Sequence, residues 1–113
     1  MIAIQKYVYA QYAKCAAKRG YSFNLTPDQF LEIASQPCVY CTASNTNKAT
    51  RKQYAVKEWS YNGVDRVNSD LSYSIGNCVA CCKACNAAKS DQPLAVFLAS
   101  EWLASRVKMI KGE

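Results

Sequence analysis

Histidine is absent from this sequence of 113 residues, and no apolar run is long enough to cross a bilayer. Without histidine, no imidazole is available to act as a general base near neutral pH. A membrane span needs roughly 20 consecutive apolar residues, so we expect no membrane partner. No leader with a basic start and an apolar core opens the chain. We therefore expect an intracellular protein, in the cytoplasm of a bacterial or other host cell, that is not secreted.

Internal repeats and a second domain are also lacking, and the length suits one domain over residues 1–113. What the chain does have is cysteine, seven residues in all. An odd number of cysteines in an intracellular protein favours metal binding over disulfides. The set whose two C-x-x-C spacings suit one tetrahedral zinc ion is Cys38, Cys41, Cys82 and Cys85. Cys78 and Cys81 form another C-x-x-C, so the register of the second pair stays open. Cys15 lies outside any pair and is expected to be a core thiol.

Basic residues outnumber acidic ones by 14 to 8, which gives a formal net charge of +6. Such a balance favours a polyanionic partner, although in a small protein the same charge can serve solubility alone. The polar stretch Thr42–Gln53 is predicted to be a surface loop. Its Arg51 and Lys52 suit contact with a phosphate backbone, and plain solvent exposure suits them equally.

Periodicity and turn signals predict helices at both ends of the chain. The first spans Met1–Arg19 and stops at Gly20, and the second runs from the Thr26-Pro27 start to about Ser35. The first helix is expected to bury Ile4, Val8, Tyr12 and Cys15. A last helix is expected to end near Lys111. It is expected to bury a stripe formed by Leu94, Phe97, Leu98, Trp102 and Met109.

The middle of the chain predicts two strands and a short helix. Asn62-Gly63 is typical of a tight turn. The strands are expected at Val64–Val67 and Tyr73–Val79, with a loop between them. The helix is expected to run from Cys82 to Lys89.

Three stretches together resemble the HNH endonucleases of the His-Me finger (ββα-metal) group. They read AAKRGYSFNLTPDQFLEIASQPCVYC, NGVDRVN and SYSIGNCVACCKACNAAKSD. The likeness covers most of the chain and is closest to the small zinc-stabilised type of bacteriophages and large DNA viruses. It implies an α+β fold with a zinc-stabilised ββα core in residues 37–90. N-terminal helices in residues 1–36 and a C-terminal helix in residues 91–113 would flank that core.

The resemblance also implies roles for single residues. The family binds structural zinc through two C-x-x-C pairs, and the pair that precedes C-N-x-x-K is Cys82 with Cys85. Asp65 and Asn86 match the positions that hold a catalytic Mg²⁺ or Mn²⁺ ion. Asn77 matches the asparagine that ties the ββ loop together and is interpreted as structural.

Arg66 stands where the family usually has its water-activating histidine. A guanidinium stays protonated at physiological pH and cannot accept a proton. Arg66 could instead clamp a phosphate, or pair with Asp65 or Asp70. Asp70, Tyr73 or a metal-bound hydroxide could replace the missing base. The residues expected to contact nucleic acid are Arg66, Lys83, Lys89, Arg51 and Lys52.

Two functions follow, and the sequence leaves cleavage open. The first is a catalytically degenerate, zinc-stabilised module that binds nucleic acid, with DNA favoured, alone or on a larger nucleic-acid-processing complex. The alternative is an active Mg²⁺- or Mn²⁺-dependent DNA endonuclease that uses a base other than histidine. A protein-binding adaptor that exposes Trp59 or Trp102 is a lesser possibility.

Overall fold

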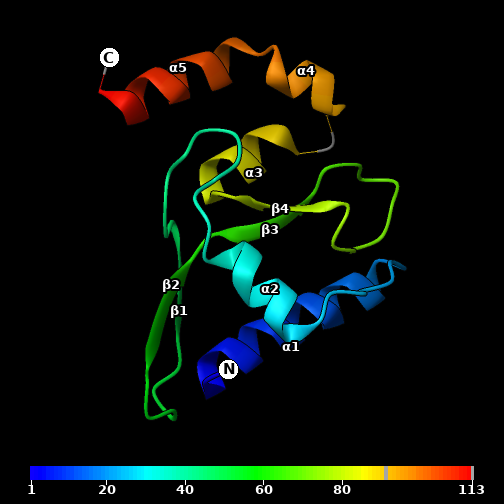
Figure 1. Cartoon of the computed structure of the whole chain (residues 1–113), viewed down its shortest axis with the longest axis vertical. Helices are drawn as coiled ribbons and strands as arrows, with labels where there is room; N and C mark the ends of the chain where they lie inside the picture. The colour runs from blue at the N-terminus through cyan, green and yellow to red at the C-terminus, as the bar shows by residue number, and fades with distance from the viewer. Residues whose placement is uncertain (91, 113) are drawn as a thin grey trace.

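The computed structural model describes residues 1–90 and 92–112, and its helices and small sheets confirm the predicted α+β class. The helices are α1 (Ala3–Lys18), α2 (Pro27–Ala34), α3 (Lys83–Lys89), α4 (Leu94–Leu98) and α5 (Glu101–Lys111). The strands are β1 (Asn47–Thr50), β2 (Glu58–Tyr61), β3 (Gly63–Arg66) and β4 (Cys78–Cys81). In Figure 1, β3 and β4 lie in the middle, with α3, α4 and α5 on one side and α2 and α1 on the other. The predicted start of the C-terminal segment, Asp91, lies outside the described residues.

The N-terminal helices begin and end where the sequence signals predict. The hydroxyl of Thr26 accepts a hydrogen bond from Gln29 N at 3.2 Å, and Thr26 N donates to Gln29 Oε1 at 3.0 Å. Gly20 follows α1 with a φ of +80°, a left-handed conformation that glycine adopts without strain. Cys15 is exposed, because its neighbour Ala16 takes the inward position on α1. The prediction that Cys15 is a core thiol is therefore wrong.

Strands β3 and β4 pair antiparallel, with Asp65 opposite Val79. The sequence predicts the returning strand at Tyr73–Val79, but β4 is Cys78–Cys81. Tyr73 forms a parallel bridge with Phe23 instead, which fastens the ββ loop to the segment between α1 and α2. The strand prediction is therefore right in kind and too early in position.

Strands β1 and β2 form a second antiparallel pair, which we call the β1–β2 arm (residues 47–61). Its register runs from Asn47 opposite Tyr61 to Thr50 opposite Glu58. The prediction of a surface loop over Thr42–Gln53 missed β1, because a polar strand of four residues carries no hydrophobic alternation to reveal it. Figure 1 shows the arm extending away from β3 and β4 along the side of the molecule.

Asn62 forms a buried corner between the two sheets and not the tight turn that its Asn-Gly sequence predicts. Its backbone N–H donates to Ala34 O at 2.9 Å. Its side-chain Oδ1 accepts from Thr46 N at 3.2 Å and from Thr46 Oγ1 at 2.9 Å. Its Nδ2 donates to the carbonyls of Gln36 and Ala43 at 2.8 and 2.9 Å. Because each polar group of the side chain is paired, its burial leaves no hydrogen bond unmade.

The C-terminal segment forms two helices where the sequence predicts one. Ser100 begins the second, because its hydroxyl accepts from Leu103 N at 3.2 Å. Phe97 and Leu103 are buried. The residues of the predicted core stripe that are exposed instead are Leu98, Trp102 and Met109, at 53%, 41% and 59%. Within residues 1–90 and 92–112, no helix combines the length and apolar character of a membrane span.

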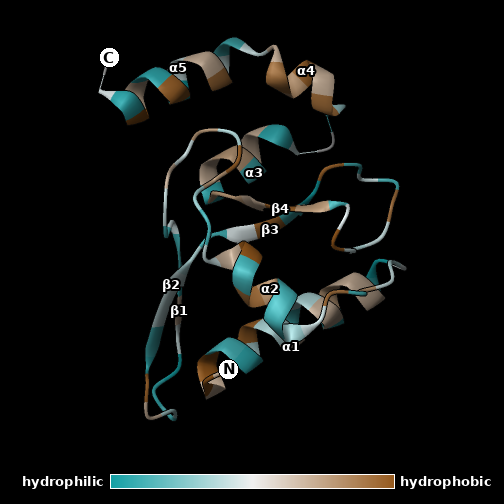
Figure 2. Ribbon diagram, viewed as in Figure 1, coloured by the Kyte–Doolittle hydropathy of each residue, from teal (hydrophilic) through white to brown (hydrophobic). Residues whose placement is uncertain are grey.

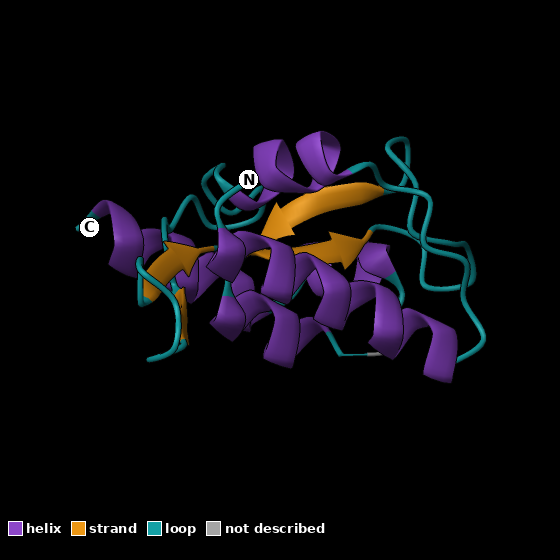
Figure 3. Ribbon diagram, turned by 90° about the horizontal axis from the view of Figure 1, so that it is seen from below, coloured by secondary structure: helices purple, strands orange, loops and turns teal. Residues whose placement is uncertain are grey.

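Two separate buried clusters support these elements. The aromatic core consists of Val8, Ala16, Leu25, Phe30, Ile33, Ala34, Val64, Tyr73, Cys78 and Ala80. The cysteine core consists of Cys38, Cys41, Cys81, Cys82, Cys85, Phe97 and Leu103. Figure 2 shows hydrophobic segments on the helices that border these clusters, whereas the β1–β2 arm is mostly hydrophilic or neutral. The view from below in Figure 3 shows helices lying across the strands.

Candidate functional site

Four cysteine sulfurs converge at one end of the β3–β4 pair. The side chains of Cys38, Cys41, Cys82 and Cys85 are buried, and their Sγ atoms lie within 4.8 Å of one another. The register left open by the sequence is thereby resolved, because Cys82 and Cys85, and not Cys78 and Cys81, join the first pair. Four thiolates are the donor set of structural zinc sites, so these residues can hold a metal ion such as zinc.

The local backbone presents both cysteine pairs to the same point. After α2, Cys38 N donates to Ala43 O at 2.8 Å and Thr42 N donates to Cys38 O at 2.9 Å, which closes a tight loop. Val39 N donates to Ala80 O at 2.9 Å and joins this loop to β4. Cys82 caps α3, where its Sγ accepts from the backbone N–H of Cys85 at 3.3 Å.

The sulfurs of the cluster differ in how readily they lose their protons. Burial raises the pKa of the Cys41 and Cys85 thiols, because a buried thiolate loses its hydration. A hydrogen bond with Cys81 lowers the pKa of Cys38 to about 4. Arg106 on α5 brings Nη2 to 3.9 Å from Cys82 Sγ, so a positive charge already borders the sulfurs. A metal ion would stabilise the remaining thiolates.

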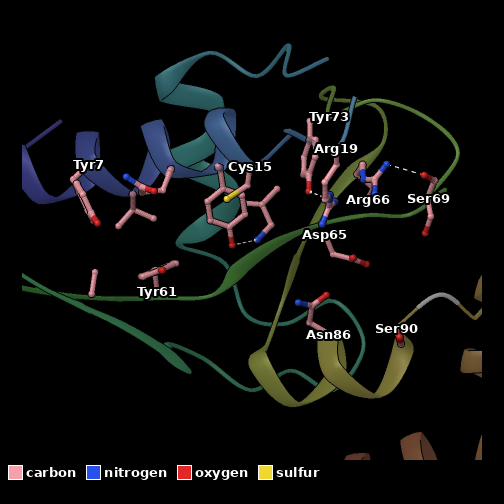
Figure 4. Close-up of a pocket in the computed structure, with 15 residues that line it drawn as sticks. Tyr7, Cys15, Arg19, Tyr61, Asp65, Arg66, Ser69, Tyr73, Asn86 and Ser90 are labelled. Atoms are coloured by element: carbon pink, nitrogen blue, oxygen red, sulfur yellow. Dashed lines mark hydrogen bonds between the residues drawn. The ribbon is translucent and has the colours of Figure 1, made fainter. Parts of the chain in front are cut away.

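Asp65 on β3 and Asn86 on α3 both line a groove of about 540 Å³. Figure 4 shows their side chains projecting from these facing elements into the same space. A second, smaller hollow of about 60 Å³ is also lined by both residues. The structure thus brings together the acid and the amide that the resemblance assigns to a divalent metal. One carboxylate and one amide carbonyl are hard oxygen ligands of the kind that Mg²⁺ and Mn²⁺ prefer.

Asp65 also has two partners that the sequence did not reveal. Lys89 Nζ lies 3.2 Å from Asp65 Oδ2, and the hydroxyl of Tyr40 donates to the same oxygen at 3.4 Å. Burial raises the pKa of Tyr40, so this hydroxyl stays protonated and acts as a donor. Asp65 Oδ2 therefore carries both contacts. The spacing of C-N-x-x-K, which puts Lys89 about one helical turn after Asn86, was the available signal for Lys89.

Lys89 was expected to contact nucleic acid from the surface, and the structure does not present it there. Its side chain is 2% exposed, and its ammonium also donates to Arg66 O at 3.3 Å. A buried ammonium needs such partners, because an unpaired charge in the interior is costly. The burial of Lys89 could not be predicted from the sequence, because it depends on how α3 packs and directs this side chain toward β3.

Arg66 fastens the ββ loop. Its Nη1 donates to Ser69 O at 2.7 Å and to Leu71 O at 3.0 Å. Its guanidinium lies 3.8 Å from the ring centroid of Tyr21, a close cation–π contact. Within the described residues Arg66 forms no ion pair with Asp65 or Asp70, so that interpretation is wrong. Arg66 still lines the groove beside Asp65.

Asn77 uses both ends of its amide to tie the same loop together. Its Oδ1 accepts from Asn68 N at 2.9 Å, and its Nδ2 donates to the carbonyls of Asn68 and Ser72 at 3.0 Å each. Its side chain is buried and lies outside the groove lining. Arg66 and Asn77 together give the loop a fixed shape next to Asp65.

The remaining basic candidates differ in their surroundings. Lys83 is exposed and lines the smaller hollow beside Asp65 and Asn86. Lys52 is exposed at the tip of the β1–β2 arm. Arg51 is only partly exposed, because its guanidinium lies 3.9 Å from the ring centroid of Tyr7. Lys83 and Lys52 are thus accessible to a ligand, whereas Arg51 fastens the arm to α1.

Helix α1 forms the wall of the groove opposite Asp65, which the sequence did not indicate. Tyr12 holds this wall in place, because its hydroxyl accepts from Val64 N at 3.2 Å. Burial raises the pKa of Tyr12 to about 12, so the hydroxyl stays neutral. Arg19 Nη2 donates to the hydroxyl of Tyr73 at 3.2 Å at the far end of the groove. The charged guanidinium of Arg19 therefore faces the same space as Asp65 and Asn86.

The comparisons with known proteins agree with this geometry. No protein-family model matches the sequence. An uncharacterized protein of Acanthamoeba polyphaga mimivirus, R423, is 29% identical over 90 residues, which cover 80% of this chain. The chain spans only 15% of the length of that viral protein.

Among solved structures, the chain is similar to the rare-cutting HNH restriction endonuclease PacI, for which a mechanism of DNA perturbation is described. The TM-score is 0.64 at 25% sequence identity, and the match covers 96% of this chain and 78% of that chain. The chain therefore has an HNH-type nuclease fold, which confirms the family resemblance of its motifs. The viral relative agrees with the viral character of that resemblance.

Proposed function

We propose that this chain binds DNA along the groove between α1 and the β3–α3 platform, and that zinc closes its cysteine core. The observation that carries the proposal is that Asp65 and Asn86, from separate elements, line one groove. Arg19 and Arg66 line the same groove, and the net charge of +6 favours a polyanion. The structural neighbour of the same fold is a DNA-cutting enzyme, which favours DNA over RNA.

Binding can be tested with a fluorescently labelled DNA duplex and the metal-loaded protein at several salt concentrations. Neutralised phosphates release counterions, so the logarithm of affinity should fall linearly with the logarithm of salt concentration. An affinity that does not change with salt, or no detectable binding at low salt, would contradict the proposal. The second of these results would favour the protein-binding adaptor.

Cleavage is the second candidate function, and the convergence of Asp65 with Asn86 favours it. These residues would hold a Mg²⁺ or Mn²⁺ ion by a carboxylate and an amide oxygen, with phosphate oxygens completing the ligand set. Such an ion polarises a phosphodiester and lowers the pKa of bound water. Lys89 and Tyr40 would fix the rotamer of Asp65, since both contact its Oδ2 atom.

A base is still required for full activity, and the groove narrows the choice. Tyr73 lines it, whereas Asp70 is exposed on the ββ loop and lies outside the lining residues. Arg66 cannot accept a proton, and its hydrogen bonds serve the loop. We infer that the side-chain base is the Tyr73 hydroxyl, which accepts a hydrogen bond from Arg19. Tyr73→Phe tests this, because it removes only that hydroxyl.

A plasmid-nicking assay with Mg²⁺ or Mn²⁺ separates cleavage from binding alone. Asp65→Asn and Asn86→Ala should abolish nicking. DNA binding should persist in Asn86→Ala, whereas Asp65→Asn also leaves Lys89 without its anionic partner, so the fold of that variant is checked by circular dichroism. Asp28→Asn is the matched control, because Asp28 is an exposed acid on α2 that does not line the groove. Wild-type protein that binds DNA and never nicks it would leave the degenerate, binding-only function. Nicking that survives both groove substitutions would contradict the assignment of the metal site.

A further inference from the structure

The β1–β2 arm has an inner face that the fold uses and an outer face that it does not. On the inner face, Ala49, Trp59 and Tyr61 pack against the aromatic core. The rings of Trp59 and Tyr61 stack with centroids 4.4 Å apart and planes 14° apart. Strand side chains alternate between faces, so the intervening residues must point away from the core. The arm is therefore a two-stranded ribbon whose inner face packs against the aromatic core and whose outer face, the free face, points to solvent.

The free face carries four polar side chains in a compact square. These residues are Lys48, Thr50, Glu58 and Ser60, and all are exposed. Lys48 lies opposite Ser60, and Thr50 lies opposite Glu58. Lys48 Nζ and Glu58 Oε1 are 3.2 Å apart, with side chains 57% and 59% exposed. An exposed ion pair of this kind contributes little to stability, so both groups can exchange partners at small cost.

The charge of the arm favours a polyanion. It holds four basic residues, Lys48, Arg51, Lys52 and Lys57, and one acidic residue, Glu58. Arg51 N donates to Lys57 O at 2.8 Å and so closes the base of the tip, while the Arg51 side chain stacks on Tyr7. Lys52 and Lys57 are left exposed around this anchor. The tip is thus both fixed in position and positively charged.

The dimensions and chemistry of the free face fit a duplex better than a single strand. The major groove of B-DNA is about 12 Å wide and admits a two-stranded ribbon. Four strand residues span roughly 14 Å, which is the reach of a few base pairs. A single strand is usually bound by stacking its bases on exposed aromatic rings, but Trp59 and Tyr61 face the core. The major groove of an RNA duplex is too deep and narrow for such a ribbon.

We propose that the β1–β2 arm lies in the major groove of double-stranded DNA and reads its sequence. Lys48, Thr50, Glu58 and Ser60 present hydrogen-bond donors and acceptors to the base edges, and Lys52 and Lys57 contact phosphates. The proposal rests on the DNA binding proposed above and adds the form of the DNA and the source of sequence preference. β2 passes through Asn62 directly into β3, so the bases that the arm reads determine which phosphate reaches Asp65.

The test is selection of binding sites from a random duplex library by the metal-loaded protein. The wild type should enrich a defined sequence. Thr50→Ala combined with Ser60→Ala should relax the preference at one or more base pairs by about tenfold, while affinity for random duplex changes less than about twofold. Both positions are exposed, so neither change should affect folding.

Phosphate binding gives a different signature. Lys52→Ala combined with Lys57→Ala should weaken binding of every duplex alike and lower the salt slope by about 0.9 for each phosphate that is no longer neutralised. Lys108→Ala combined with Lys111→Ala, two exposed positions on α5 at the opposite end of the molecule, is the matched control. This control should keep both the slope and the sequence preference.

The outcomes distinguish the proposed role of the β1–β2 arm from the proposal that the chain binds DNA. A wild type that binds no nucleic acid would overturn the proposed function and the arm together. A wild type that binds duplex without sequence preference, or that keeps its preference after the Thr50 and Ser60 changes, would overturn the arm alone. Tighter binding of single-stranded DNA than of duplex would also overturn the arm and leave nucleic-acid binding in place.

Discussion

The aromatic core and the cysteine core differ in what holds them together. The aromatic core is built from large side chains in direct contact, with Phe30 within 5.4 Å of Tyr9 and 5.1 Å of Tyr12 between ring centroids. In the cysteine core, five of the seven described buried residues are cysteines. Thiols offer little apolar area, so this half has little cohesion of its own. The first core is stabilised by packing, whereas the second has the donor set for a metal ion, which we propose it needs for stability.

The candidate site lies where the two cores meet. Asp65 is on β3, where the adjacent Val64 belongs to the aromatic core. Lys89 is on α3, whose N-cap Cys82 belongs to the cysteine core. The ion pair between Asp65 and Lys89 joins the two halves across 3.2 Å. Neither core alone can assemble the site. The comparison therefore predicts that a substitution in either core disrupts the groove. The loss of folding free energy should differ between the two cores.

Loss of the metal should have the largest effect. Cys85→Ser, or chelation under reducing conditions, should unfold α3, α4 and α5, because zinc contributes on the order of 10 kcal/mol to such domains. Metal analysis should give about one zinc per wild-type chain and less for the variant, with a matching decrease in helical circular dichroism. Cys15→Ser is the control, because Cys15 is exposed and outside the cluster. A chelated protein that keeps its wild-type stability would contradict the comparison.

Truncation in the aromatic core should come next. Phe30→Ala should lower the free energy of unfolding by about 3–5 kcal/mol, since it removes a fully buried ring and leaves a cavity. Urea titration of the metal-loaded protein measures this decrease. The folded fraction should still bind metal with wild-type stoichiometry. Failure of the folded variant to bind metal would show that the two cores are not separate.

The Asn62 corner should give an intermediate effect. Asn62→Ala leaves the Thr46 hydroxyl and two backbone carbonyls without their partner and should cost about 2 kcal/mol. Urea titration measures the destabilisation, and hydrogen exchange should locate it in the β1–β2 arm and the loop around Cys38. Asn24→Ala, at an exposed position, is the control. Unchanged exchange in the arm would argue against Asn62 as its anchor.

Substitution of Arg106 should give the smallest effect, and that effect should be confined to zinc affinity. Arg106→Gln removes the charge beside Cys82 Sγ and should weaken zinc affinity about tenfold, or about 1.4 kcal/mol. Competition with a chromophoric chelator measures the affinity. Lys108→Gln, on the same helix and exposed, should leave it unchanged. Equal affinities for the two variants would mean that Arg106 does not stabilise the cluster.

Local signals in the sequence predicted the helices and helix ends that depend only on neighbouring residues. The capping box at Thr26, the stop at Gly20 and the α3 helix all follow from residues a few positions apart. The convergence of Asp65 with Asn86 came from the family resemblance, since nothing local joins the two. β1 was missed because its four residues show no hydrophobic alternation, and its order comes from pairing with β2 and from the Asn62 corner.

Side-chain partners at the site were the hardest to predict. Lys89 and Arg66 were both expected to be available to phosphate, and each has a use in the fold that depends on tertiary contacts. The same contacts bear on restoring a histidine at position 66, because Arg66→His would remove two hydrogen bonds to the ββ loop. We expect that change to loosen the loop rather than to restore a base.

The Asn62 corner has a consequence for how such a protein can diversify. The outer positions of the arm lie between Thr46 and Asn62, whose mutual hydrogen bonds hold both of its ends. Under the proposed mode of DNA binding, substitutions at these outer positions would alter the DNA sequence preference while the β3–α3 platform keeps its shape. The arm of a relative, joined at Thr46 and Asn62, should therefore replace this arm without disturbing the β3–α3 platform.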